Sequence, residues 1–395
     1  MNNVKYANML VMPELDTTEK RLLPFGILSR LREESPVRYD AVRGCWEVFA
    51  YEDVHQVLKD HGHFSSARGA SAGESVLFSD PPRHTQLRDL VNKAFTPRAI
   101  QEFTPRIESI VHDLLAHADG SGMDIVHDYA TPLPVIIIAE LLGAPQEDRD
   151  RFKRWSDVLV ESAQNDTEEA FRGVMERRQQ AISELSAYFT SLLELRAKRP
   201  QDDLISLLLM AEIDGERLTP RELISFCVLL MVAGNETTTN LITNGVRLLT
   251  EQPDLQRELR RNLDLVPEFV EETLRFYPPV VAIGRVAKQD TAIGSSTVKA
   301  GEQIIAWVGA ANRDPGKFHD PDSFLLGRKP NPHLSFGFGI HFCLGAPLAR
   351  LEAKHALGAL LRHAEALAAA PDRTLTPIAS SFVFGVKSFP VAFRS

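Results

Sequence analysis

The amino-acid sequence predicts a mainly helical protein with small β-sheets, an α+β chain, and three observations lead to this class. Hydrophobic residues recur at helical spacing through most of residues 51–276 and again over residues 346–369. Alternating patterns typical of strands are confined to residues 36–50 and 285–308. Strand and helix patterns do not alternate along the chain, which excludes a doubly wound parallel sheet.

The two strand-like stretches contain recognisable turns. Residues 36–50 (PVRYDAVRGCWEVFA) alternate around Gly44, which predicts a short hairpin. Residues 285–308 carry turn signals at Gly294 and Gly301 and predict a second β-rich patch. We therefore expect small sheets at one side of a helical body.

The C-terminal part is expected to add one helix and one hairpin. Residues 346–369 have an apolar face at helical spacing, and the proline-punctuated residues 376–393 predict a closing hairpin. The sequence shows no internal repeat, low-complexity tract or flexible linker. Residues 1–395 are therefore expected to form a single domain.

Composition limits the classes of function. Of the 395 residues, 44% are hydrophobic and 25% are charged, which is typical of a soluble globular protein. The net charge of −9 leaves no excess of Lys and Arg for a nucleic-acid surface. The most apolar stretch, residues 223–234, is shorter than the roughly twenty residues that span a bilayer. Residues 1–21 lack the apolar run of a signal peptide, so no membrane partner is expected.

The chain has three cysteines, Cys45, Cys227 and Cys343, which are far apart and include no C-x-x-C pair. A disulfide framework or a zinc site is therefore not expected. The protein is expected in a reducing compartment, the cytoplasm. Cys45 and Cys227 lie in apolar patterns and are expected to be small core residues. Three histidines outside the motifs below are expected at the surface or in loops: His55, His112 and His127.

The clearest helix is predicted over residues 219–253. Thr219 and Glu222 form a capping box with Pro220 at the first helical position, and Pro253 ends the pattern. The helix would be roughly 45 Å long at 1.5 Å per residue. Because its first half is apolar on every face, it is expected to cross the protein interior.

A polar run, AGNETTTN, interrupts this helix at residues 233–240. One interpretation is that the helix reaches the surface and these side chains are solvated. Three consecutive threonines argue mildly against it, because their hydroxyls compete for backbone carbonyls and tend to bend helices. The alternative is a groove at Ala233 and Gly234, with Glu236 and Thr237 beside a centre that needs protons. The residues alone leave both interpretations open.

Residues 336–345 read F-G-x-G-x-H-x-C-x-G, and their glycines permit close backbone approach to a flat or bulky ligand. Cys343 lies at or just before the start of a predicted helix, where free N–H groups and the helix dipole stabilise a thiolate. Two roles stay open: a nucleophile with His341 as its base, or a metal ligand. A single cysteine cannot build a zinc or iron–sulfur site, but it can be the axial ligand of a haem iron.

A third motif, E-x-x-R, places Glu272 and Arg275 on one face of a helix that ends at a double proline. Taken alone, this pair is best explained as an ordinary surface ion pair of little energetic value.

The three motifs together, in this order and spacing, resemble the cytochrome P450 family, and specifically its soluble bacterial type: A-G-x-E-T at residues 233–237, E-x-x-R at 272–275 and F-G-x-G-x-H-x-C-x-G at 336–345. The similarity extends over nearly the whole chain, including DPPRHTQLRDLVNKAFTPR at residues 80–98 and AANRDP at 310–315. The resemblance implies the single-domain P450 fold, with haem b buried between the long helix and the helix after the cysteine loop.

The resemblance assigns the contacts of the cofactor. Cys343 would be the proximal thiolate on the haem iron, and Phe336 would pack beside it and shield the sulfur. Charge-assisted hydrogen bonds would hold the two propionates, and their donors would be His84, Arg88, Arg285 and His341. Ala233 and Gly345 are expected to line the cofactor site.

The resemblance also assigns roles away from the cofactor. Glu236 and Thr237 would form the acid–alcohol pair that relays protons during oxygen activation, with Asn240 supporting their groove. Glu272 and Arg275 would be structural.

One position departs from the family pattern. Ser323 stands where the family often has an arginine. Arg328, or backbone groups near Asn331, would then be the third partner of the Glu272–Arg275 pair.

The activity implied is that of a haem-thiolate monooxygenase, which uses O2 to hydroxylate a hydrophobic small molecule. Because 395 residues leave no room for a flavin or ferredoxin domain, electrons would come from a ferredoxin and its NAD(P)H-dependent reductase. The protein is expected to be a monomer with a local basic patch that docks this partner, formed by Arg98, Arg106, Arg350 and Lys354.

The segments expected over the distal pocket are apolar, which suits a steroid, a terpenoid or a fatty acid. No cationic anchor for a carboxylate is evident in them, so a steroid or terpenoid is expected before a fatty acid. The expected lining residues are Val76, Leu77, Phe78, Leu230, Ala233, Val280, Val281, Ile283, Phe382 and Phe384.

Three other functions compete with this hypothesis. A peroxygenase driven by hydrogen peroxide is disfavoured, because it normally replaces the acid–alcohol pair that is intact here at Glu236 and Thr237. A non-catalytic haem protein, such as a gas sensor, is disfavoured by the same pair and by the apolar pocket. A cysteine hydrolase would contain no haem.

Overall fold

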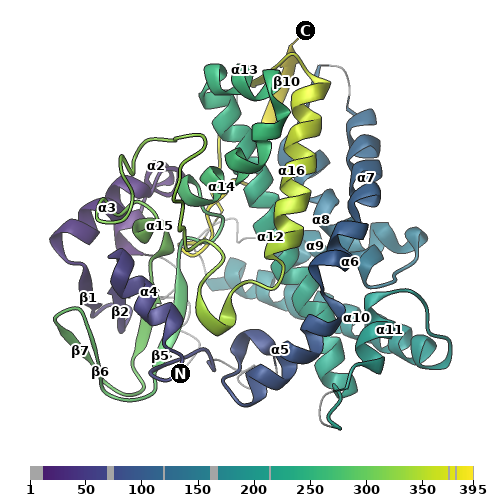
Figure 1. Ribbon diagram of the computed structural model, residues 1–395, viewed down its shortest axis with the longest axis horizontal. Coiled ribbons are helices and arrows are strands. Elements are labelled where there is room, and N and C mark those ends of the chain that lie inside the picture. Colours follow the sequence, from purple (N-terminus) through teal and green to yellow (C-terminus); the bar gives the residue numbers. More distant parts are fainter. Residues whose placement is uncertain are drawn as a thin grey trace.

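The structure is a computed structural model that describes residues 12–68, 75–118, 121–160, 168–212, 215–371, 374–378 and 380–394. Residues 1–11, on which part of the signal-peptide expectation rests, lie outside the described residues. Helices fill most of the molecule, and the strands of the larger sheet lie on one side of it (Figure 1). Within the described ranges, no helix is long and apolar enough to span a membrane.

The β-rich side is built on a five-stranded sheet with the order β1-β2-β8-β5-β3. Its strands are β1 (Val37–Asp40), β2 (Cys45–Val48), β3 (Phe64–Ser65), β5 (Ile283–Ala287) and β8 (Gln303–Ala306). The predicted hairpin is confirmed, because β1 and β2 pair antiparallel around Gly44, whose φ is +67°. β2 pairs parallel with β8, and β5 pairs antiparallel with β8 and β3.

The second predicted β-rich patch is also confirmed. Besides β5 and β8 it contains a separate two-stranded ribbon, formed by β6 (Thr291–Ile293) and β7 (Ser296–Val298). Gly294 and Gly301, the predicted turn positions, have φ values of +55° and +84°.

The helices follow in three groups. The first comprises η1 (Pro13–Leu15), α2 (Thr18–Leu22), α3 (Phe25–Glu34), α4 (Tyr51–Lys59), η2 (Val76–Phe78), α5 (Arg83–Ala94), α6 (Pro97–Glu102) and α7 (Thr104–Ala116). The second comprises η3 (Ile125–Ala130), α8 (Pro132–Leu141), η4 (Gln146–Asp148), α9 (Arg149–Val160), α10 (Glu168–Lys198) and α11 (Leu204–Met210). The third comprises α12 (Pro220–Glu251), α13 (Pro253–Arg261), η5 (Leu263–Leu265), α14 (Val266–Phe276), α15 (Val308–Ala311), η6 (Gly339–His341) and α16 (Ala346–His363).

The predicted long helix is confirmed as α12, which has 32 residues. Thr219 caps it by accepting a hydrogen bond from the N–H of Glu222, while the Glu222 carboxylate accepts one from the N–H of Thr219 at 2.9 Å. α12 packs against α8, α10, α14 and α16, so it crosses the interior as its apolar first half predicted.

The last predicted helix ends earlier than expected. α16 stops at His363, and residues 366–369 form β9 (Ala366–Ala369), which pairs with β10 (Pro390–Arg394). β10 also pairs with β4 (Gly122–Asp124). The helix prediction was wrong for the final residues because these ladders, together with hydrogen bonds between Gln256 and the backbone of Leu367, outweigh the helix preference of alanine.

The closing hairpin predicted at residues 376–393 is present only in part. Pro377 and Val386 form an isolated bridge, and the N–H of Lys387 donates to the carbonyl of Thr376 at 2.9 Å. Beyond them the chain leaves the hairpin, because β10 pairs with β4 and β9 instead.

The larger hydrophobic core collects side chains from Met12 to Val391 and includes both cysteines predicted to be structural. Cys45 and Cys227 are completely buried, and burial raises the pKa of the Cys45 thiol to about 11. His112 and His127 are exposed as expected. His55 is not an ordinary surface residue, because its ring packs 4.2 Å from that of Phe338 in the cysteine loop.

Candidate cofactor site around Cys343

The cysteine loop precedes α16 and owes its shape to two glycines. Gly337 and Gly339 both have a φ of +71°, a conformation that other residues rarely adopt. A Cβ atom at Gly339 would lie 3.0 Å from the carbonyl oxygen of Leu58, so glycine also permits contact with the end of α4. The N–H of Cys343 donates to the carbonyl of Phe336 at 2.9 Å and closes the loop.

Cys343 lies two residues before Gly345, the N-cap of α16. The residue is exposed, yet burial of the thiol among neighbouring protein atoms raises its pKa. The N–H groups of Gly345 and Ala346 and the guanidinium of Arg88 oppose this effect and lower the pKa. A sulfur enclosed by protein on most sides, open on another and supported by N–H donors suits a thiolate metal ligand.

The ring of Phe336, whose carbonyl accepts the hydrogen bond that closes the loop, is in contact with a cation. The guanidinium of Arg350 lies 4.4 Å from the centre of the Phe336 ring, and its Nε donates to Glu271 at 2.6 Å. Burial raises the pKa of Glu271, but hydrogen bonds from His333 and Arg350 outweigh it and lower this pKa to about 2. Arg350, expected to belong to the docking patch, therefore contacts Glu271 and the ring of Phe336 instead.

The four residues predicted to hold the propionates form one cluster. The rings of His84 on α5 and His341 on η6 are 4.2 Å apart, and Arg88 donates to the carbonyl of Phe342 at 2.8 Å. Arg285 on β5 is 7% exposed. Burial, followed by the nearby cations, lowers the pKa of His341 to about 3 and that of Arg285 to about 10. Such a concentration of buried donors is unfavourable unless an anion joins it.

Unpartnered atoms in this cluster show where the anion belongs. Both ring nitrogens of His84 and Nε2 of His341 are buried without a hydrogen-bond partner among the described residues. Buried polar atoms of this kind normally have a partner, so they indicate a ligand that presents acceptors. Haem b presents two propionate carboxylates and an iron that binds a thiolate, so it fits this site. Cys343 would ligate its iron, and these donors would hold its propionates. No group of three or more His, Cys, Asp or Glu side chains in the described chain could hold a different metal ion.

The polar run of α12 is divided between two faces of the helix. Ala233 is exposed, and the hydroxyl of Thr237 donates to its carbonyl at 2.7 Å. The interpretation that the whole run is solvated is wrong, because four of its polar side chains are at most 7% exposed: Asn235, Thr238, Thr239 and Asn240.

Glu236, beside Thr237, has the properties of a proton carrier. Burial raises the pKa of its carboxyl, and the charge of Arg178 on α10 partly lowers it. A raised pKa means that the carboxyl keeps its proton to higher pH than an exposed glutamate does, which is the direction that a proton donor requires. Asn240, expected to support this groove, is buried against the C-terminal segment, where a Cβ at Gly385 would collide with its side-chain oxygen.

Gly234 on the other face permits close packing. A Cβ there would collide with Cδ1 of Ile138 on α8. Leu230, Gly234 and Thr238 lie one helical turn apart and line a cavity of about 40 Å³ between α12, α8 and α16. Gly345 lines the same cavity, so it adjoins the cysteine loop.

Glu352 of α16 lines this cavity and was missed by the sequence analysis. Its side chain is 1% exposed, and one carboxylate oxygen has no partner. Burial raises its pKa to about 8, although a hydrogen bond with Thr238 lowers it. The available signal was a glutamate between Leu351 and Ala353 on the apolar face of α16.

The substitution Glu352→Gln is expected to flatten the pH dependence of stability. The folded-state pKa of about 8 exceeds the usual glutamate value of 4.5, so between these pH values the folded chain binds the extra proton. Stability therefore falls as pH rises through this window, at a slope approaching about 1.4 kcal/mol per pH unit. Glutamine can still bond Thr238 but does not titrate. Urea unfolding from pH 5 to 8 will show a smaller fall in the variant, and the exposed Glu102→Gln is the control. Identical pH profiles for wild type and variant would contradict this assignment.

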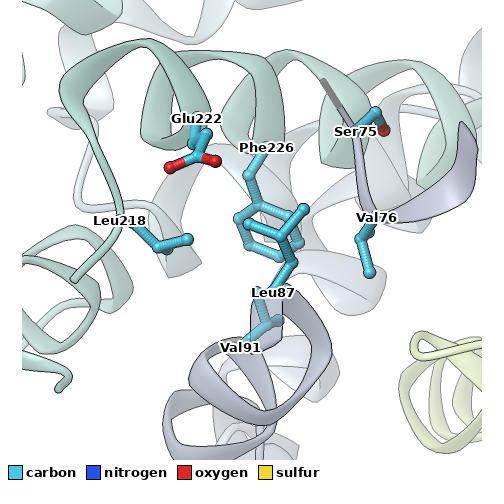
Figure 2. A pocket seen from close by; sticks show the side chains of 7 residues that line it. All are labelled: Ser75, Val76, Leu87, Val91, Leu218, Glu222 and Phe226. Carbon is cyan, nitrogen blue, oxygen red and sulfur yellow. The ribbon is translucent and has the colours of Figure 1, made fainter. Parts of the chain in front are cut away.

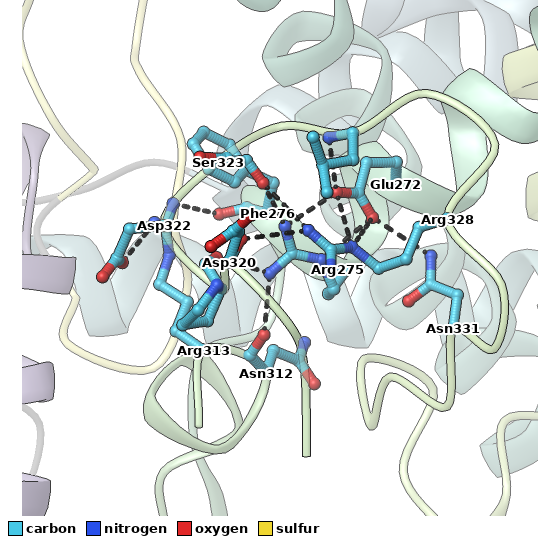
Figure 3. A network of polar contacts seen from close by, with 12 residues as sticks. Glu272, Arg275, Phe276, Asn312, Arg313, Asp320, Asp322, Ser323, Arg328 and Asn331 are labelled. Atoms are coloured by element: carbon cyan, nitrogen blue, oxygen red, sulfur yellow. Dashed lines mark hydrogen bonds and ion pairs between the residues drawn. The ribbon is translucent and has the colours of Figure 1, made fainter. Parts of the chain in front are cut away.

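Glu272 and Arg275 form a buried pair, not a surface one (Figure 3). Their side chains are 1% and 0% exposed, and Arg275 donates through Nη2 and Nε at 2.7 and 2.9 Å. Arg328 donates to Glu272 at 3.1 Å and Asn331 at 3.2 Å, so Arg328 is the third charged partner. Arg275 also donates to three backbone carbonyls, those of Asn312, Pro321 and Ser323.

The predicted substrate residues of η2 lie in different surroundings. Val76 contributes to a small cavity of about 10 Å³, where Phe226 of α12 points toward Leu87 and Val91 of α5 (Figure 2). Leu77 is 43% exposed. Phe78 is half-buried, and the guanidinium of Arg68 lies 5.6 Å from the centre of its ring.

The other predicted substrate residues divide into core and partly exposed positions. Val281 and Phe384 are 3% and 4% exposed and belong to the hydrophobic core. Phe382 stacks on Trp307 with ring centres 6.4 Å apart. Val280, Ile283 and Phe382 are half-buried, and Ile283 lies 3.8 Å from the position of a Cβ at Gly337 in the cysteine loop.

Two of the four expected docking residues keep their charge at the surface. The Arg98 side chain is 90% exposed, although it donates to Glu102 at 3.0 Å, and Lys354 is exposed. Arg106 instead donates to both carboxylate oxygens of Glu140 at 2.5 and 2.6 Å.

Comparison with known proteins is consistent with this geometry. The family model described as "Cytochrome P450" matches residues 46–390. The chain is 53% identical over 389 residues to Cytochrome P450 109 of Bacillus spizizenii, covering 98% of this chain and 96% of that protein. Substrate-free CYP109E1 from Bacillus megaterium superposes with a TM-score of 0.91 at 41% identity, covering 95% of this chain and 99% of that one. The complex of CYP109E1 with testosterone superposes with a TM-score of 0.88 at 41% identity, covering 94% of this chain and 99% of that one.

Members of this family are monooxygenases that bind haem b, and they use O2 with electrons from redox partners. Three observations point to this family: the exposed Cys343, the cation cluster with unpartnered nitrogens, and the family match over most of the chain. The chain belongs to the cytochrome P450 family.

Proposed function

We propose that the protein inserts one oxygen atom of O2 into a hydrophobic small molecule, with steroids, terpenoids and fatty acids as the candidate substrates. The observation that carries this proposal is that α12 carries Glu236, whose carboxyl has a raised pKa, directly beside Thr237, while Cys343 is exposed just before α16. A structural relative at 41% identity was crystallised with testosterone, which supports a steroid-sized apolar ligand.

The chain's own residues would divide the work. Bound haem supplies the redox chemistry. Cys343 would donate its thiolate, shielded by Phe336, while His84, Arg88, Arg285 and His341 would hold the carboxylates of the cofactor. Glu236 would release a proton from its carboxyl, and Thr237 would pass it on through its hydroxyl. The apolar side chains of Val280, Ile283 and Phe382 would exclude water and orient the substrate.

Electrons would arrive from a ferredoxin reduced by an NAD(P)H-dependent reductase, and the protein would act as a cytoplasmic monomer. An acidic ferredoxin would meet Arg98 and Lys354, whose charges lie at the surface. Arg350 would contribute less to docking, because its guanidinium is already engaged by Glu271 and Phe336.

The proposal is tested by turnover with a ferredoxin, its reductase and NADPH, using testosterone, a monoterpene and dodecanoic acid. We expect NADPH consumption that depends on substrate and one oxygenated product per cycle. Thr237→Ala is expected to lower product formed per NADPH by about tenfold or more, because positioned proton transfer contributes at least 100-fold in typical enzymes. The control is Thr250→Ala, which alters a threonine near the end of α12. Turnover with hydrogen peroxide alone would favour a peroxygenase. Haem binding without any product would favour a sensor.

A further inference from the structure

Glu271 lies on α14, directly before the buried Glu272, and joins this helix to α16. The two helices pack against each other (Figure 1). The carboxylate of Glu271 accepts hydrogen bonds from Nε and Nη2 of Arg350 at 2.6 and 3.0 Å, so both of its oxygens are engaged by one guanidinium. Because the buried pair of Glu272 and Arg275 fixes α14, Glu271 is carried on a rigid base.

A histidine next to the cysteine loop fixes the same carboxylate. Nε2 of His333 lies 3.2 Å from Oε2 of Glu271, and Nδ1 of His333 accepts from the N–H of Ser335 at 3.3 Å. An ionised carboxylate only accepts, so Nε2 carries the proton, Nδ1 does not, and His333 is a neutral donor. Burial raises the pKa of Glu271, but its hydrogen bonds lower it to about 2, so the carboxylate is ionised at neutral pH. Its one negative charge therefore balances the one positive charge of Arg350.

Arg350 connects Glu271 to the cysteine loop. Its guanidinium lies 4.4 Å from the centre of the Phe336 ring, and the ring of His333 is 6.1 Å from that of Phe336. The carbonyl of Phe336 accepts from the N–H of Cys343 at 2.9 Å. Burial raises the pKa of Cys343, whereas the charge of Arg350 is among the groups that lower it. This guanidinium therefore acts on both the aromatic ring of the loop and the thiolate.

We propose that Glu271 is a positioning residue for the haem site: through Arg350 it holds a cation against Phe336 and balances the positive charge that acts on Cys343. Removing the carboxylate leaves that charge unbalanced, which favours ferrous haem because reduction adds an electron at the iron. Removing the guanidinium has the opposite effect. The inference rests on the part of the proposed function in which Cys343 ligates the haem iron.

The opposite signs distinguish this role from a merely structural one. The side chains of Glu271 and Arg350 are 36% and 35% exposed, so the pair contributes little to stability. If it only joined α14 to α16, loss of either partner would break the same contact and would change the haem site in the same direction.

The test measures the reduction potential of the holoprotein without a ferredoxin, by titration with dithionite and mediator dyes, so that partner docking cannot contribute. Glu271→Gln removes the negative charge and keeps an oxygen that accepts from Arg350. Arg350→Gln removes the positive charge, and Arg350→Lys keeps it. Glu268→Gln is the matched control, because this carboxylate lies on the same helix, is 35% exposed and pairs with Lys329 instead.

We expect Glu271→Gln to shift the reduction equilibrium toward ferrous haem by about two- to fivefold, which is roughly 20–40 mV for a one-electron couple. Arg350→Gln should shift it toward ferric haem by a similar factor, Arg350→Lys should stay nearer to the wild type, and Glu268→Gln should leave it unchanged.

Three outcomes would overturn the role of Glu271. The first is a shift of Glu271→Gln and Arg350→Gln in the same direction, and the second is no shift in either. The third is a shift in Glu268→Gln as large as that in Glu271→Gln. If Glu271→Gln does not retain haem, the two Arg350 variants decide, since equal shifts in Arg350→Gln and Arg350→Lys would show that the charge has no effect.

The carbon monoxide spectrum separates this inference from the proposed function. A wild-type protein with a thiolate-type spectrum, together with any of these outcomes, overturns the role of Glu271 and leaves the ligation by Cys343 intact. A wild-type protein without that spectrum overturns the ligation and the inference with it.

Discussion

Cys343→Ser is expected to abolish the carbon monoxide spectrum of a thiolate-ligated haem and to reduce monooxygenase turnover to background. A serine hydroxyl stays protonated at neutral pH, so it cannot supply the anionic ligand that the N–H groups at the start of α16 support. The loop should keep its shape, because its closing hydrogen bond joins two backbone groups, the N–H of residue 343 and the carbonyl of Phe336. Reduced difference spectra and haem content of the purified variant measure the effect.

Cys227→Ala provides the control for this prediction. Cys227 is buried in α12 and has no part in the loop, so the variant should keep a normal carbon monoxide spectrum with a modest loss of stability. A normal thiolate spectrum in Cys343→Ser would exclude Cys343 as the ligand and would transfer that role to another group.

Arg275→Ala is expected to lower the free energy of unfolding by about 3–5 kcal/mol, because it leaves the carboxylate of Glu272 buried without its main partner. Arg328 and Asn331 still donate to this carboxylate, which favours the lower end of that range. The variant also loses three hydrogen bonds to backbone carbonyls that tie α14 to residues 312–323. Because native domains are stable by only about 5–15 kcal/mol, a loss of this size should lower the yield of folded, haem-containing protein.

Urea unfolding with a paired control tests this prediction. Lys329→Ala breaks an exposed pair with Glu268 in the same region, at 3.0 Å, and should cost less than about 1 kcal/mol. If Arg275→Ala does not fold, Glu272→Leu combined with Arg275→Met should recover part of the loss, since an apolar pair replaces two buried charges. Equal effects of Arg275→Ala and Lys329→Ala would show that burial of the pair contributes little.

Local patterns predicted the elements whose cause is local. The hairpin around Gly44 follows from alternation and one glycine, and the start of α12 follows from a capping box within four residues. The end of α16 could not be predicted in this way. Residues 364–369 favour a helix by composition, but their strand depends on β10, which lies more than twenty residues further along the chain.

The same distinction applies to the candidate site. Cys343, Glu236 and Thr237 belong to short motifs, so the sequence was sufficient to name them. Glu352 belongs to none, because what distinguishes it is a partner distant in sequence, Thr238. The pair of Glu272 and Arg275 was visible as a motif, but its burial depends on residues 312–331 and could not be read from spacing alone.

The unbroken course of α12 limits how the chain can vary in length. Ala233 and Thr237 lie on one face, whereas their immediate neighbours Gly234 and Thr238 face α8 and α16. Neighbouring residues are about 100° apart around an α-helix. Inserting one residue upstream would therefore turn Thr237 toward α16 and bring Glu236 into its place, whereas deleting one residue would bring Thr238 into the place of Thr237. The number of residues between the capping box and Ala233 therefore fixes the orientation of Thr237, whereas many apolar side chains are acceptable within that stretch.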